Sequence, residues 1–167
     1  MSDRVELEHD LLAEKWERLI NVVVDNVFIT ILYGLTFLVA LLLYKVFDYD
    51  NLFLWIIDIN EFERFGLISV LSFSYYTFFE TVTNGSTIGK YVTGTKVMAL
   101  SGPLTLKDVA TRSLIRLIPF EGLSFIGNYN TGWHDSISGT VVISVSKYQL
   151  AVRKQKFEAQ ITMANAG

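Results

Sequence analysis

The chain of 167 residues contains no cysteine and only two histidines. The absence of cysteine excludes a disulfide framework, a thiolate metal site and a cysteine nucleophile. Two histidines do not make a zinc site by themselves, so the sequence predicts neither a metal nor another cofactor. A basic surplus is also lacking, because the net charge is -3 at pH 7. Nucleic-acid binding is therefore not expected, since it needs cations that neutralise phosphates.

Apolar residues, by contrast, are abundant. They make up 51% of the chain, with 14% aromatic residues, and the mean hydropathy is +0.37. These values are high for a water-soluble protein of one-domain size, so the lipid bilayer is the expected solvent for much of the chain.

Two apolar runs are long enough to cross that bilayer. Residues 19–43 are nearly all apolar and exceed the ~20 residues that a transmembrane helix needs. Residues 65–82 form a second run whose only charge is Glu80. The acidic connection between the runs contains the short sequence LFLWII at 52–57, which predicts an interfacial segment.

The distribution of basic residues predicts the orientation. Five basic residues lie in the connection 83–116: Lys90, Lys96, Lys107, Arg112 and Arg116. The tail adds Lys147, Arg153, Lys154 and Lys156. By the positive-inside rule both regions are cytoplasmic, and so is the amino terminus. The sequence thus predicts a multi-pass protein of the bacterial inner membrane with an even number of crossings.

The remaining elements complete the expected architecture. Residues 113–127 are apolar but interrupted by Arg116, Pro119 and Glu121, which favours an amphipathic or partly inserted third helix. Thr105 and Asp108 resemble a capping box that marks the start of this helix. The β-branched runs at 93–100 and 138–146 predict a small cytoplasmic β element in which they pair. The fold class is thus an α-helical membrane protein with two firm spans. Its parts are a cytoplasmic amphipathic leader (1–17), a membrane domain (18–146) and a basic cytoplasmic tail (147–167).

Charged residues near the cytoplasmic ends of the two spans form the expected site. Asp25 and Glu80 lie at similar depth because their helices are antiparallel, and two carboxylates in low dielectric tend to bind a proton, a metal cation or a basic side chain. The basic candidates are Arg18, Lys90, Arg112 and Arg116. Three interpretations stay open: a structural network that locks the helix ends, an ion or proton site, and a water-accessible vestibule for a polar ligand.

The pair His134 and Asp135 invites a catalytic interpretation, which the sequence does not support. Adjacent side chains rarely aim at one atom, and no nucleophile motif accompanies them. Asp135 is instead expected to cap a helix or to accept from an arginine. The stretch NGSTIGKYVTG lacks the order of a phosphate loop, so the sequence predicts no enzyme.

These features together resemble the RDD family of small bacterial membrane proteins. The resemblance runs from about Trp16 to Val145 and rests on Arg18, Asp25, the segment FFETVTNGSTIGKYVTGTKVM and the closing motif WHDSISGTVVI with Asp135. Relatives often have a longer apolar stretch where this chain has residues 118–135, which argues against a third full crossing here.

The resemblance implies a membrane role with transport suggested, and cation/proton antiport in some members. The leading expectation is a transport or cation/proton exchange component that uses Asp25 and Glu80, with Arg18 and Arg112 as counter-charges. Two or three helices enclose no pathway, so a homo-oligomer or another membrane protein is the expected partner. The alternative is a non-transporting scaffold or assembly subunit.

Overall fold

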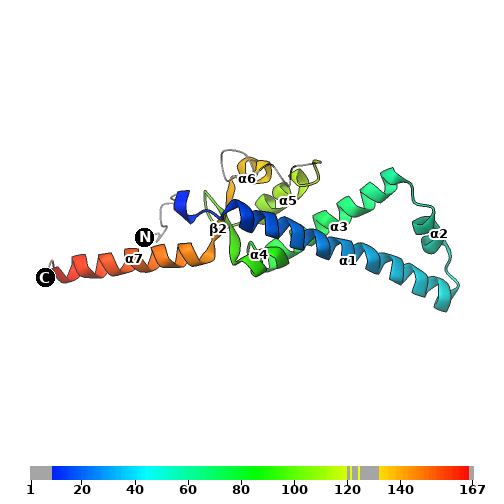
Figure 1. The fold of residues 1–167 in the computed structure, drawn as a ribbon, viewed down its shortest axis with the longest axis horizontal. Helices are drawn as coiled ribbons and strands as arrows, with labels where there is room; N and C mark the ends of the chain where they lie inside the picture. The colour runs from blue at the N-terminus through cyan, green and yellow to red at the C-terminus, as the bar shows by residue number, and fades with distance from the viewer. Residues whose placement is uncertain (1–8, 120, 122–123, 125–131, 166–167) are drawn as a thin grey trace.

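The computed structural model describes residues 9–119, 121, 124 and 132–165. The protein is mostly helical and elongated, with a helical hairpin at one end, a single projecting helix at the other and a mixed helix and strand region between them (Figure 1). The site lies in this middle region.

Helix α1 (Lys15–Phe47) is the long apolar helix that the sequence predicts. A reciprocal capping box of Glu14 and Glu17 begins it, and Asp48 ends it in the left-handed conformation at φ 51°. Its apolar side chains point outward on most sides, as expected for a helix in contact with lipid. Among the helices of the described residues, α1 alone is long and apolar enough to cross a membrane by length and composition.

Helices α2 (Asn51–Ile57) and α3 (Glu61–Val82) complete the hairpin. Asn60 and Glu63 form the capping box that begins α3. The expected second span, 65–82, lies within α3. Polar side chains lower the hydropathy of α3, so its crossing of the bilayer remains a prediction. Ile29 packs against Tyr75 and Tyr76 where α1 and α3 meet.

Two short helices follow the hairpin. Helix α4 (Ile88–Thr93) begins at Thr87 and ends at Gly94, whose φ of 67° suits glycine. Helix α5 (Leu106–Ile115) has the predicted capping box of Thr105 and Asp108. The expected start of the third helix at this capping box is confirmed, but its extension through 113–127 is wrong, because the helix ends at Ile115 and the chain turns there. Residues 120, 122–123 and 125–127 of that prediction lie outside the described residues.

Strands β1 (Thr95–Ala99) and β2 (Thr140–Ser144) pair antiparallel, which confirms the expected pairing. Their side of the membrane remains a prediction. Ala13 N also donates to Val142 O at 2.9 Å, so the backbone before α1 extends the small sheet. The expected leader helix is therefore wrong over the described residues, where only the 3-10 turn η1 (His9–Leu11) precedes α1; residues 1–8 lie outside them.

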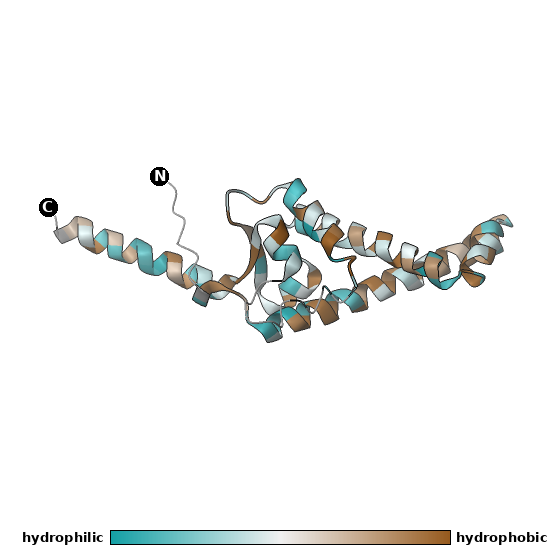
Figure 2. Cartoon of the chain, turned by 90° about the horizontal axis from the view of Figure 1, so that it is seen from above, coloured by the Kyte–Doolittle hydropathy of each residue, from teal (hydrophilic) through white to brown (hydrophobic). Residues whose placement is uncertain are grey.

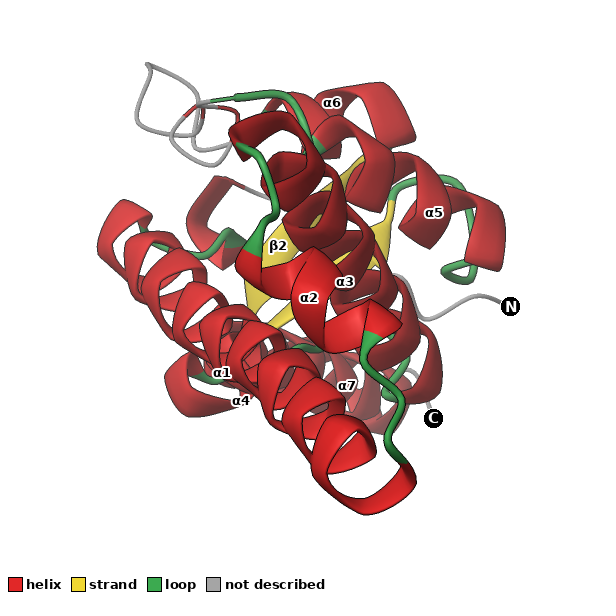
Figure 3. Cartoon of the chain, turned by 90° about the vertical axis from the view of Figure 1, so that its right-hand side faces the viewer, coloured by secondary structure: helices red, strands yellow, loops and turns green. Residues whose placement is uncertain are grey.

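The last elements are helix α6 (Trp133–Ser138), strand β2 and helix α7 (Val145–Asn165). Helix α7 projects away from the middle region and is more hydrophilic than the hairpin at the other end (Figure 2). Viewed along the long axis, α4 and α5 lie on opposite sides of the molecule (Figure 3). The charged side chains of the site converge from these surrounding helices.

Candidate functional site

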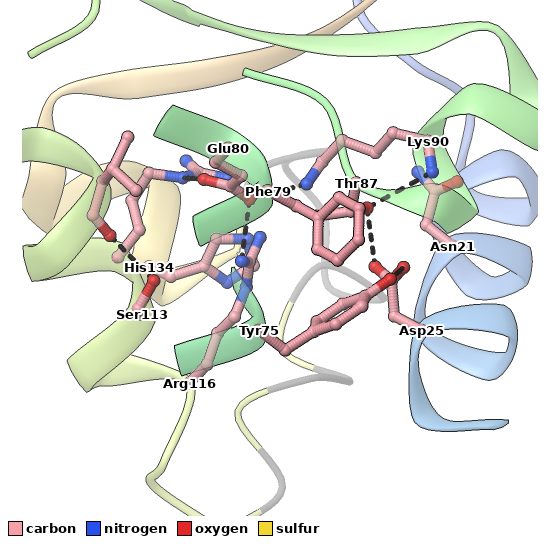
Figure 4. Close-up of polar contacts among 12 residues, drawn as sticks. Asn21, Asp25, Tyr75, Phe79, Glu80, Thr87, Lys90, Ser113, Arg116 and His134 are labelled. Carbon is pink, nitrogen blue, oxygen red and sulfur yellow. Dashed lines mark hydrogen bonds and ion pairs between the residues drawn. The ribbon is translucent and has the colours of Figure 1, made fainter. Parts of the chain in front are cut away.

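Asp25 is buried on α1, where neutral donors surround its carboxylate. It accepts hydrogen bonds from the Tyr75 hydroxyl at 2.7 Å and the Thr87 hydroxyl at 2.8 Å (Figure 4). The Gly89 backbone N–H also donates to it, at 2.8 Å. Hydrogen bonds of this kind stabilise a charged carboxylate. Gly89 lies where α4 touches α1. A larger residue would not fit there without a shift, because a Cβ on Gly89 would lie 2.6 Å from Asn21 O.

Glu80, fully buried near the end of α3, is surrounded by cations. Oε1 accepts from Lys90 Nζ at 2.7 Å and from Arg116 at 2.8 Å, and Oε2 accepts from Arg112 Nε at 3.2 Å. Arg116 also stacks over the ring of Tyr76, with its guanidinium carbon 4.2 Å from the ring centroid. Glu80 therefore joins α3 to α4, to α5 and to the turn after α5.

Asp135, also fully buried, is the second acidic centre. Arg18 from α1 and Arg112 from α5 both donate to it, and the backbone N–H of Gly132 donates to it at 3.1 Å. The sequence predicts that Asp135 caps a helix or accepts from an arginine, and in the structure it does both. Arg112 thus bridges Glu80 and Asp135, and it also donates to the Thr140 hydroxyl.

His134 and Glu121 form a pair that the sequence interpretation did not place in the site. Glu121 Oε1 contacts His134 Nδ1 and accepts from the backbone N–H of His134 at 3.0 Å. Nδ1–H is then the donor, and Nε2 is left to face the Arg18 guanidinium at 3.5 Å. In the sequence, Glu121 stands out only as one of the charges that interrupt the apolar segment 113–127. An isolated acidic residue in such a segment is the signal that could have identified it.

The pKa values outside the expected spans follow from burial and neighbouring charges. Burial lowers the pKa of His134 to about 4, so its imidazole is neutral at pH 7. Burial also lowers the pKa of Lys90, with Glu80 opposing the effect, to about 8. Burial alone would raise the pKa of Asp135, but Arg112 and Arg18 hold it well below its usual range.

The structure brings all seven predicted residues into one region, which we call the charged cluster together with Glu121 and His134. Asp25 and Glu80 do not share a hydrogen-bond partner in the described contacts, however. Helix α4 lies between them, with Thr87 bonded to Asp25 and Lys90 to Glu80. Arg112 is a counter-charge of Glu80 as expected, whereas Arg18 pairs with Asp135.

The charges of this cluster balance. Four basic side chains (Arg18, Lys90, Arg112 and Arg116) face four acidic ones (Asp25, Glu80, Glu121 and Asp135). With His134 neutral, the described members of the cluster carry no net charge. An added ion of either sign would leave an unbalanced charge in a low-dielectric region, which is costly.

The fold and the cluster define a helical membrane protein whose buried ion pairs hold several helices together. A family model described as "RDD family" matches residues 12–156, and the chain belongs to the RDD family. No curated protein and no solved structure matches the chain. The match covers Arg18, Asp25 and Asp135 together with both strands.

Proposed function

We propose that this protein is a non-transporting scaffold or assembly subunit of the bacterial inner membrane. In this proposal α1 and α3 both cross the bilayer, and the termini and the small sheet lie on the cytoplasmic side. The observation that carries it is the set of buried ion pairs made by Glu80 and Asp135 in a cluster of balanced charge, which joins α1, α3, α4, α5 and α6.

Carboxylates that are already paired with several cations suit a structural role better than ion exchange. An exchanger needs a carboxylate that releases its partners and takes up a proton or a cation within the working pH range. Glu80 has three cationic partners and Asp135 has two arginines. Replacing these partners with a mobile ion would break several buried ion pairs at once. Each buried charge that loses its partner strongly destabilises the fold.

Helix α7 provides the surface that such a subunit would offer. Its apolar side chains Leu150, Phe157 and Ile161 are exposed and lie on one face at helical spacing. Basic residues flank this face. A rigid middle region would therefore hold α7 clear of the membrane hairpin, where it is available to a second copy or another membrane protein. The proposal includes no catalytic step.

Cation/proton exchange at Asp25 remains the second candidate, because one observation favours it. Asp25 lines a cavity of about 290 Å³ between α1 and α3, together with the polar side chains Asn26, Ser69 and Ser72. Its donors are neutral groups that could remain in place while a cation binds.

Flux and complex size test the two candidates. Reconstituted vesicles containing the wild-type protein should show no more pH-driven cation flux than empty vesicles. In mild detergent the protein should run as a complex larger than its 19.0 kDa monomer, and the double variant Leu150→Glu with Phe157→Glu should dissociate that complex. Cation flux that Asp25→Asn abolishes, with the variant folded, would overturn the scaffold proposal in favour of exchange.

A further inference from the structure

The cavity beside Asp25 has two chemically different ends. The apolar residues Phe65 and Ile68 of α3 line one end, and the basic residues Arg18, Lys90 and Arg116 line the other, beside Asp25. Phe65 lies eleven residues before Tyr76 on α3, or ~16 Å along the axis at 1.5 Å per residue, and Arg116 stacks on Tyr76. The cavity is thus an elongated cleft that runs from the charged cluster along the outer, apolar part of the hairpin.

The cationic end presents its basic groups to the cleft. Glu80 and Asp135, which pair with these cations, are not among the residues that line it. A guanidinium has five N–H donors, and Arg116 uses Nη1 for Glu80 while its plane rests on Tyr76. Arg116 and Lys90 thus line the cleft and each has N–H donors that Glu80 does not use, from which an anionic group in the cleft would accept.

One acidic group in the same cleft has an unused acceptor. Glu121 lines the cleft with its side chain fully buried. Among the described residues nothing donates a hydrogen bond to its Oε2, although Oε1 accepts from His134 and Ser124. A buried carboxylate oxygen without a partner is costly, so a ligand that donates to it would be favoured.

We propose that this cleft binds a zwitterionic phospholipid with a phosphoethanolamine head group. The phosphate accepts from Arg116 and Lys90, the primary ammonium donates to Glu121 Oε2, and an acyl chain lies along Ile29, Phe65 and Ile68. Such a head group brings one negative and one positive charge, so it leaves the balanced cluster neutral. This ligand site does not depend on the scaffold role.

Three lipids distinguish this assignment from less specific binding. Phosphatidylcholine has the same charges but a quaternary ammonium without an N–H donor, and phosphatidylglycerol has a net negative charge. Titration of each lipid into the detergent-solubilised protein, followed by native mass spectrometry, should show phosphatidylethanolamine bound about tenfold more tightly than either. Equal affinity for phosphatidylcholine, or a preference for phosphatidylglycerol, would overturn the proposal.

Two variants locate the site without removing an ion pair of Glu80 or Asp135. Ser72→Trp fills the cleft and should abolish lipid retention, whereas Val70→Trp, on the exposed side of the same helix, should not. Glu121→Gln should equalise phosphatidylethanolamine and phosphatidylcholine while leaving phospholipid binding itself in place. Circular dichroism of each variant checks the fold. Retention of lipid selectivity in a folded Ser72→Trp or Glu121→Gln protein would show that the cleft is not the site.

Discussion

Arg18 and Asp135 lie 117 residues apart in the chain and form a buried ion pair, with side-chain exposures of 4% and 0%. The pair joins the start of the long apolar helix α1 to the short helix α6. Arg112 extends it to Glu80, so one continuous set of charges holds helices from both halves of the sequence together.

Arg112→Met tests the contribution of this bridge. The variant leaves Glu80 and Asp135 each without one buried partner, and we expect a loss of about 3–5 kcal/mol in the free energy of unfolding. The measurement is equilibrium unfolding in mixed micelles followed by helical circular dichroism. Arg64→Ala is the matched control, because the Arg64 and Glu61 side chains are 41% and 87% exposed and such a pair contributes ~1 kcal/mol or less. Similar losses for both variants would contradict the structural role of the cluster.

Gly89→Ala tests the close approach of α4 to α1. The added methyl group would lie 2.6 Å from Asn21 O and 2.9 Å from Asp25 Oδ1, so the helices must separate and the N–H bond to Asp25 must lengthen. We expect a destabilisation of about 1–3 kcal/mol. Gly34→Ala is the control, because a Cβ there meets nothing within 4 Å and alanine favours a helix. An unchanged stability of Gly89→Ala would mean that this contact is looser than the structure shows.

The histidine gives a pH dependence of defined sign. The pKa of His134 is about 4 in the folded protein, against 6.5 for the free side chain, chiefly because of burial. Between these values the unfolded chain binds the proton and the folded protein does not. Stability is therefore complete above pH 6.5 and falls by about 3 kcal/mol as the pH drops towards 4. Unfolding measured at pH 7, 6, 5 and 4.5 checks this trend.

His134→Gln provides the control for that pH series. The amide can still donate to Glu121 but does not titrate, so the stability of this variant should fall much less than that of the wild type between pH 7 and about 4.5. A wild-type protein that is equally stable at pH 7 and pH 4.5 would contradict the buried, neutral state of His134.

Membrane orientation can be tested with single cysteines, because the chain has none of its own. Asp50→Cys, before α2, should react with an impermeant maleimide in intact cells. Gly102→Cys, between β1 and α5, should react only after the cells are permeabilised. External labelling at Gly102 would reverse the proposed orientation.

Local patterns in the sequence determined several parts of this protein. Three of these patterns depend only on residues that are close in the chain: the apolar run at 19–43, the capping residues Thr105 and Asp108, and the two β-branched runs. The structure has the corresponding helix, cap and strand pair. The charged residues of the site were also recognisable, because an ionisable side chain in or beside an apolar segment is unusual wherever it occurs.

Only the tertiary structure decided how those charges are partnered. Asp25 and Glu80 were expected to form one site, but α4 inserts between them. The Thr87 hydroxyl and the Gly89 N–H bind Asp25, whereas Lys90 of α4 binds Glu80 together with two arginines from α5 and the turn after it. Glu121 belongs to the cluster because it contacts His134. The helix expected to include 113–127 ends at Ile115, where the chain turns. An ion pair between residues more than 100 positions apart depends on how whole helices pack in three dimensions. The spacing of residues along the chain therefore does not predict it.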